Sequence, residues 1–143
     1  MLYNVLKEIY FCLDNGDRRV MDAYNLSVPR YYALKNIGEN PGISLTHLSD
    51  LMLSDKSNIT RLVKSIEDDG LVTRKPREGD RRSMSLYLTK RGQELLQKAS
   101  AAHQAFIRDR FSEASVDIPL LLEQLSTLKR NLEQQLEQNW PGQ

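Results

Sequence analysis

One stretch, residues 54–71, constrains the fold of this chain more than any other. It begins with Ser54, which can cap a helix, and reaches Gly70, which can end one. The apolar residues between them recur at intervals of three and four, so one helical face carries Ile59, Leu62, Val63 and Ile66. The opposite face carries Ser57, Arg61, Lys64 and Asp68. Such a helix packs on one side, and its polar side either lies in solvent or fits a DNA major groove.

The sequence before this stretch decides between those two readings. Ser44 can cap a short helix over Leu45–Met52, which a tight turn separates from the longer helix. A short helix, a turn and a longer helix with a polar outer face predict a helix-turn-helix. Upstream, Ser27 caps a further helix that runs to about Glu39, and Ile43 is expected to form a one-residue strand.

After Gly70 the apolar period changes from the helical value to the alternation of a strand. Leu71–Arg74 and Ser83–Leu88 both have strand character, and a polar loop over Pro76–Arg82 joins them. This predicts a β-hairpin with Arg77, Arg81 and Arg82 at its tip. A hairpin directly after a helix-turn-helix is the wing of a winged helix-turn-helix.

The two ends of the chain predict helices that need a partner. The first is expected over residues 2–25, with apolar residues on more than one face, and Thr89 caps another that runs to about Phe111. The last helix starts at Asp117, and its apolar residues step near the period of a coiled-coil seam: Ile118, Leu121, Leu125, Leu128, Leu132 and Leu136. One globular core does not easily cover these surfaces, which indicates burial against a second chain.

The composition fits a protein that is mainly α with a small β-hairpin. The chain has 143 residues, of which 40% are hydrophobic and 27% charged, as in an ordinary globular domain. The net charge of +1 conceals a local basic patch, since residues 71–91 hold seven basic and two acidic residues. We expect an N-terminal dimerisation helix over residues 1–25, a winged helix-turn-helix DNA-binding domain over 26–91, and C-terminal dimerisation helices over 92–143.

Several classes of protein are not favoured by the sequence. The only cysteine, Cys12, excludes an intramolecular disulfide, and no apolar run reaches membrane-spanning length. With no secretion signal, the expected location is the cytoplasm and no membrane partner is expected. His47 and His103 lie far apart without a ligand pattern, so no metal is expected. No nucleophile–base pair or phosphate loop is present, so neither a cofactor nor enzymatic activity is expected.

The motifs, taken together and in order, resemble the MarR family of winged helix-turn-helix regulators. Asp55–Val63 is similar to the family's recognition helix, and Gly70–Arg74 follows it as in the family. Asp80-Arg81-Arg82, then Leu88-Thr89 and Gly92, is similar to the family's wing signature. The resemblance is close over about residues 26–92. It implies a homodimer built from the first, fifth and sixth helices that binds double-stranded DNA at a pseudo-palindromic operator. It also implies a repressor, most often controlled by a small phenolic or lipophilic effector.

The chain departs from that family at the end of the recognition helix. Glu67-Asp68-Asp69 stands where a basic pair is common. Acidic residues at a helix C-terminus oppose the helix dipole, so they are expected to pair with nearby arginines such as Arg74. Only the N-terminal half of the helix, Asp55–Lys64, is then expected to meet DNA.

The side chains of this half and of the wing divide into three expected roles. Ser57, Asn58 and Arg61 are candidates for reading base edges, because Arg pairs bidentately with guanine and Asn with adenine. Lys56, Thr60 and Lys64 are expected to hold phosphates, and the wing arginines to reach a phosphate or the minor groove. The predicted DNA-binding set is Asp55, Lys56, Ser57, Asn58, Thr60, Arg61, Lys64, Arg77, Arg81 and Arg82.

Two alternatives stay open at this point. Some relatives carry a reactive cysteine in the first helix, so Cys12 is either a redox sensor or, as its apolar neighbours favour, a buried structural thiol. The second alternative is that the whole chain is a winged-helix module that binds another protein and does not bind DNA. Tyr31, Tyr32 and Trp140 either line an effector pocket or pack in a core, so no effector-binding residue is assigned.

Overall fold

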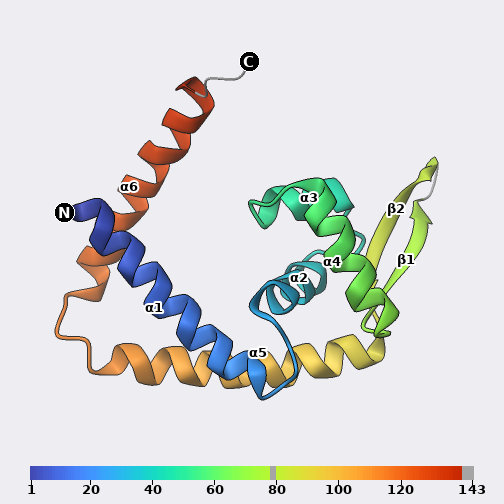
Figure 1. Ribbon diagram of the computed structural model, residues 1–143, viewed down its shortest axis with the longest axis horizontal. Helices are drawn as coiled ribbons and strands as arrows, with labels where there is room; N and C mark the ends of the chain where they lie inside the picture. The colour runs from blue at the N-terminus through green and yellow to red at the C-terminus, as the bar shows by residue number, and fades with distance from the viewer. Residues whose placement is uncertain (78–79, 140–143) are drawn as a thin grey trace. The chain divides into compact units, whose positions relative to one another are not determined.

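The computed structural model describes the backbone of residues 1–77 and 80–139, with side chains except those of residues 80–83 and 137–139. It divides into two compact units, residues 1–108 and 109–143. In chain order the elements are α1 (Leu2–Asp22), α2 (Val28–Glu39), α3 (Leu45–Leu51), α4 (Lys56–Asp68), β1 (Val72–Arg77), β2 (Asp80–Leu88), α5 (Lys90–Ser112) and α6 (Ile118–Asn139) (Figure 1). The predicted fold class, mainly α with one small hairpin, is confirmed.

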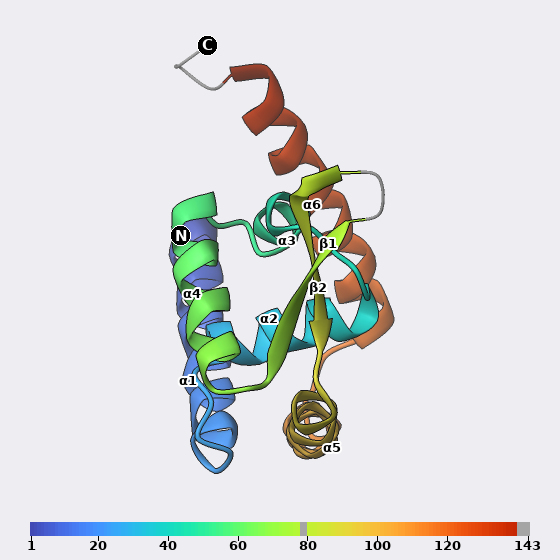
Figure 2. The same ribbon diagram turned by 90° about the vertical axis from the view of Figure 1, so that its right-hand side faces the viewer.

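The core of the first unit lies where α2, α3 and α4 meet the hairpin (Figure 2). α2 buries Leu34 and Ile37, α3 buries Leu48, and β2 buries Leu86. α4 adds the face that the spacing predicts, with Ile59, Val63 and Ile66 buried and Leu62 partly buried. Burial of one such side chain stabilises a fold by about 1.5–3 kcal/mol. The opposite face of α4 is thereby held outward.

Side-chain caps start the helices where the sequence predicts them, with one correction. Ser27 accepts a hydrogen bond from the Arg30 amide at 3.4 Å, and Ser44 accepts one from the His47 amide at 3.1 Å. The prediction that Ser54 caps the recognition helix is wrong. Asp55 is the cap and accepts from the Asn58 amide at 2.9 Å. Both residue types cap well, but a carboxylate also interacts favourably with the positive end of the helix dipole.

The hairpin is longer than the sequence pattern predicts. β1 and β2 are antiparallel, with Val72 opposite Leu88, and the predicted loop over Pro76–Arg82 is wrong at both ends. Pro76 and Arg77 belong to β1, and β2 already begins at Asp80. A two-stranded sheet has only edge strands, where a proline is tolerated, and the register shifts between Pro76 and Arg77. The expected one-residue strand is confirmed, since Ile43 pairs with Leu86.

α1 is an uninterrupted helix that ends three residues before the predicted Asn25. It stops at Asp22 because Asn25 has φ +53°, a left-handed conformation that no right-handed helix continues. Its second half joins the core through Met21, which is fully buried. Its first half exposes apolar side chains in the single chain, namely Leu2, Tyr3, Val5, Ile9, Tyr10, Phe11 and Leu13.

α6 belongs to the second compact unit and starts at the predicted cap. The Asp117 carboxylate accepts from the Leu120 amide at 3.0 Å. In the single chain this helix exposes a series of leucines, of which Leu122 is the most exposed at 65%. Within the described residues, no helix is long and apolar enough to span a bilayer.

Candidate nucleic-acid interface

The outer face of α4, together with its capping residue, gathers every recognition-helix residue of the predicted DNA-binding set. These side chains are all exposed, while Ile59 and Val63 between them point into the core. The exposed set is Asp55, Lys56, Ser57, Asn58, Thr60, Arg61 and Lys64. Three of its members are cations, so the N-terminal half of α4 offers a basic and short-polar surface on a rigid element.

Hydrogen bonds link four of these side chains in series. The Asp55 carboxylate accepts from the Ser57 hydroxyl at 2.8 Å and also from the side-chain amide of Asn58. The amide oxygen of Asn58 in turn accepts from Nη2 of Arg61 at 2.7 Å. Hydrogen bonds lower the pKa of the Asp55 carboxyl, first that from the Asn58 backbone N–H and then that from Ser57. The charged carboxylate is therefore the form that this end of the helix favours.

The three residues expected at phosphates differ in what they present. Lys56 and Lys64 are exposed and carry mobile ammonium groups that suit phosphate contacts. The Thr60 hydroxyl donates to the Lys56 carbonyl at 2.7 Å, one turn back along the helix. In this conformation Thr60 offers only acceptor positions outward, so contact with a phosphate requires its hydroxyl to rotate.

The acidic end of α4 is paired with arginines from three other elements. Glu67 forms an ion pair with Arg74 of β1, with 2.8 Å between Oε2 and Nε, which confirms the predicted partner. The Asp69 carboxylate pairs with Arg30 of α2, and the Asp69 carbonyl accepts from Nη1 of Arg91 in α5 at 3.1 Å. These contacts turn the C-terminal end of α4 toward its own protein. Arg30 was not predicted as a partner, because no local spacing relates residues 39 positions apart.

The wing is described only in part. Arg77 lies exposed at the end of β1. The side chains of Arg81 and Arg82 lie outside the described residues, although their backbone begins β2. Further down the wing the Lys75 ammonium lies 5.3 Å from the centre of the Tyr87 ring, a cation–π distance. Arg77 is thus the one predicted wing residue whose exposure the structure describes.

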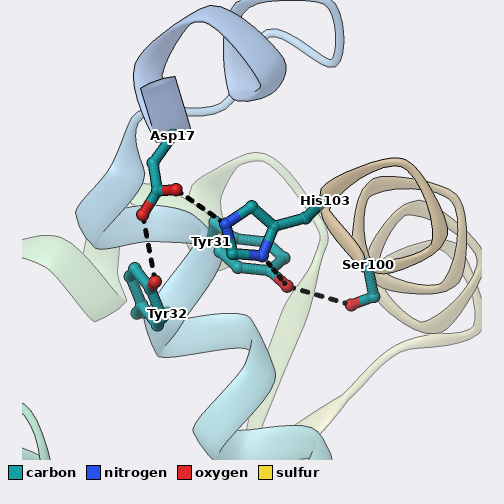
Figure 3. Close-up of polar contacts among 5 residues, drawn as sticks. All are labelled: Asp17, Tyr31, Tyr32, Ser100 and His103. Carbon is teal, nitrogen blue, oxygen red and sulfur yellow. Dashed lines mark hydrogen bonds and ion pairs between the residues drawn. The ribbon is translucent and has the colours of Figure 1, made fainter. Parts of the chain in front are cut away.

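A partly buried polar cluster joins α1, α2 and α5 (Figure 3). Asp17 of α1 accepts from Nε2 of His103 at 2.8 Å and from the Tyr32 hydroxyl at 3.1 Å. The Tyr31 hydroxyl lies 3.4 Å from both Nδ1 of His103 and Oγ of Ser100. Burial, and then the Asp17 charge, raises the pKa of Tyr32 to about 12. This cluster, which we call the Asp17 cluster, fixes three helices relative to one another within the first unit.

The structure also locates the residues that the sequence suggested for an effector pocket, a redox sensor or a metal site. Tyr31 packs in the core and Tyr32 is half-buried beside it, while Trp140 lies outside the described residues. Cys12 is exposed in the single chain, so the prediction of a buried thiol is wrong there. Its neighbours Tyr10 and Phe11 on α1 are also exposed in the single chain. Across the described residues, His, Cys, Asp and Glu side chains nowhere gather in a group of three suited to a metal ion.

Comparison with known proteins matches both the sequence and the fold. A family model described as MarR family matches residues 24–83. The organic hydroperoxide resistance transcriptional regulator of Bacillus subtilis is 32% identical over 56% of this chain and 54% of its own length. The HTH-type transcriptional regulator PecS of Dickeya dadantii is 26% identical over 80% of this chain and 71% of its own. The chain spans about half the length of most curated relatives it matches.

Solved structures extend the match to the whole described fold. The transcriptional regulator SlyA superposes with a TM-score of 0.83 at 20% identity, covering 95% of this chain and 96% of that one. The repressor CouR bound to a 23-mer DNA duplex gives 0.82 at 24%, covering 90% and 92%. BldR from Sulfolobus solfataricus gives 0.78 at 27%, covering 91% and 93%. The fold of this chain is therefore one that solved transcriptional regulators share.

Proposed function

The chain belongs to the MarR family of winged helix-turn-helix transcriptional regulators, and from this premise we propose that it is a homodimeric, sequence-specific DNA-binding repressor controlled by a small molecule. The observation that carries the proposal is the outer face of α4, where exposed Arg61, Lys56 and Lys64 share one rigid surface. A helix of this kind fits the major groove of B-form DNA. The solved complex of CouR with a DNA duplex supports the same use of this fold.

We assign the side chains of this interface as follows. Arg61, with Asn58 and Ser57 beside it, faces base edges, and Lys56, Thr60 and Lys64 hold phosphates. Asp55 caps the helix that carries them. The wing, through Arg77, Arg81 and Arg82, reaches the neighbouring backbone or minor groove. The acidic end of α4 is directed at the protein's own arginines and makes no contact with DNA.

The proposed dimer is supported by apolar surfaces that are exposed in the single chain. The first half of α1 exposes Tyr10 and Phe11 at 62% and 58%, and α6 exposes Leu122 and Leu136 at 65% and 59%. Exposed aromatic and leucine surfaces of this extent mark protein–protein interfaces. We propose a second copy of the chain as the partner, with residues 1–25 and 92–143 forming the dimer and 26–91 binding DNA. The two recognition helices then lie roughly 34 Å apart, in successive major grooves.

The effector is proposed by class only. A second solved structure of CouR, from Rhodococcus jostii, holds p-coumaroyl-CoA and superposes with a TM-score of 0.77. A phenolic or lipophilic molecule is therefore the class we propose, acting by changing the spacing of the two recognition helices. We propose the cytoplasm as the place where the protein meets its operator and effector.

A redox-responsive regulator is the second candidate, because Cys12 is exposed on α1 and a relative regulates resistance to organic hydroperoxides. In this case the Cys12 thiolate attacks the terminal oxygen of a hydroperoxide, the O–O bond breaks, and a sulfenic acid and an alcohol form. The oxidised protein then releases the DNA. Treating wild type and Cys12→Ser with cumene hydroperoxide separates the two candidates. Peroxide-induced release that Cys12→Ser lacks supports redox control, and equal behaviour of the two proteins excludes it.

The DNA-binding proposal is tested by selecting a bound sequence from random duplexes. The affinity for the selected duplex, the operator, and for a scrambled duplex is then measured at two salt concentrations. We expect a steep loss of affinity with salt for both, from counterion release, and a preference of about 10³ or more for the operator. A winged-helix module that binds only protein would show neither the preference nor the salt dependence.

A further inference from the structure

In the hydrogen-bonded series on α4, each side chain donates to the one before it, from Arg61 back to Asp55. It starts at the capping carboxylate of Asp55, passes through both ends of the Asn58 amide, and ends at the Arg61 guanidinium. The nitrogen of the Asn58 amide donates to Asp55, and its oxygen accepts from Arg61. An asparagine that reads adenine uses these same two atoms on the base. Asn58 is therefore engaged inside the protein, whereas Arg61 keeps further donors free.

We propose that Asp55 is a positioning residue that sets the sequence specificity of the recognition helix. Its carboxylate holds Asn58, and Asn58 holds Arg61 in the orientation that reads a base. The inference rests on the proposed DNA-binding function and gives Asp55 and Asn58 roles within it. Its basis is the continuous set of contacts from Asp55 to Arg61, all on the exposed face of one helix.

The physical reason lies in the freedom of a long basic side chain. An arginine that is ordered only when it meets DNA loses rotamer entropy at that moment, and an arginine ordered beforehand loses less. A fixed guanidinium fork also favours the one base edge that matches it, while a mobile one meets phosphates as readily as bases. An arginine that is oriented before binding thus raises the difference in affinity between the right and the wrong DNA sequence.

The charge of Asp55 has a separate effect on affinity. Residues 56–64 contain no other carboxylate and include the cations Lys56, Arg61 and Lys64. A carboxylate at the head of this basic face repels the phosphates of any DNA. Removing this charge is therefore expected to strengthen binding to operator and scrambled duplex by a similar factor, so a change in their affinity ratio reports positioning and not charge.

The test is the substitution Asp55→Asn. Asparagine caps a helix as well as aspartate does, and its oxygen still accepts from the backbone amide of residue 58. Its NH₂ group cannot accept from the Asn58 side chain, so the series breaks at its first link. We expect the affinity for a scrambled duplex to rise and the ratio of operator to scrambled affinity to fall about tenfold, within the discrimination that one bidentate base contact supplies.

Two controls distinguish positioning from general charge. Asp68→Asn removes one negative charge from the other end of α4, and it is expected to leave the affinity ratio unchanged. In an Arg61→Ala background, Asp55→Asn is expected to change the ratio no further, because Asp55 acts through Arg61. Thermal unfolding of each variant confirms that it folds, and Asp55→Ser, which also caps, replaces Asp55→Asn if that variant unfolds.

Each outcome decides the inference. An unchanged ratio in Asp55→Asn, with both duplexes bound more tightly, would show that Asp55 supplies charge alone and would overturn the proposal. The same fall of the ratio with and without Arg61 would overturn it too, since Asp55 would then act by another route. If wild type itself binds operator and scrambled duplex alike, the DNA-binding proposal fails, and it fails before any variant is compared.

Discussion

Gly92→Ala is expected to destabilise the chain, although alanine normally stabilises a helix. Gly92 lies in the first turn of α5, where a Cβ atom would lie 2.0 Å from the carbonyl oxygen of Leu71 and 3.0 Å from its carbon. The same oxygen accepts from the Thr89 amide at 3.0 Å, and the Thr89 hydroxyl donates to the Gly70 carbonyl at 2.7 Å. The obstacle is thus backbone held by two hydrogen bonds, and it cannot rotate away as a side chain would.

The magnitude follows from three contributions. Alanine in place of glycine gains about 1 kcal/mol in a helix interior. Separating the new Cβ from the Leu71 carbonyl requires a backbone shift of about 1.5 Å, and overpacking of this kind costs about 1–3 kcal/mol or more. Hydrogen bonds around Thr89 lost in the shift cost about 1 kcal/mol each. We expect a net loss of about 3 kcal/mol, or roughly 10 °C in Tm for a chain of this size.

Gly38→Ala is the matched control. Its Cβ would meet only the tips of two leucines, Leu96 Cδ2 at 2.9 Å and Leu88 Cδ1 at 3.1 Å, which can change rotamer. We expect its stability to stay within about 1 kcal/mol of wild type. Thermal and denaturant unfolding should be compared at one protomer concentration, because the Tm of a dimer depends on concentration. If Gly92→Ala proves as stable as Gly38→Ala, the close contact between α5 and Leu71 is refuted.

Three further predictions concern recognition, protonation and assembly. Arg61→Ala should lose preference for the operator, whereas Arg82→Ala should weaken binding to all sequences and flatten the salt slope, and equal effects in both assays would contradict this division of roles. Because the pKa of Tyr32 is raised to about 12, its protonated phenol contributes stability that is complete below about pH 10 and is lost as the pH rises through 12. Ultraviolet titration should therefore show a tyrosine that ionises near pH 12 in wild type and is absent in Tyr32→Phe. Leu125→Glu should shift the protein toward monomer in sedimentation equilibrium and weaken operator binding, and a dimer as stable as that of the control Gln124→Glu would exclude α6 from the interface.

Short-range patterns predicted most of the fold. The three- and four-residue spacing of Ile59, Val63 and Ile66 predicted the buried face of α4, because a helix places such positions side by side. The side-chain caps at Ser27 and Ser44 could also be predicted, because a capping side chain bonds an amide only three residues further along the chain. Where two adjacent residues both cap well, as at positions 54 and 55, pattern alone does not choose between them.

Features that depend on tertiary contacts could not be predicted from the sequence. Asp17 meets His103 across 86 positions and Arg30 meets Asp69 across 39, and no periodicity relates such pairs. The length of the wing was underestimated because a polar segment with proline reads as loop until the partner strand is known. The buried environment expected for Cys12 is absent in the single chain, where its apolar neighbours are exposed with it.

We propose that two copies of this chain place their α4 helices in successive major grooves of one operator. Hydroxyl-radical footprinting of the selected operator tests it most directly. We expect two symmetric patches of protection whose centres lie about one helical turn, 10–10.5 base pairs, apart, with flanking protection by the two wings. A single patch, or protection spread evenly along the duplex, would contradict it.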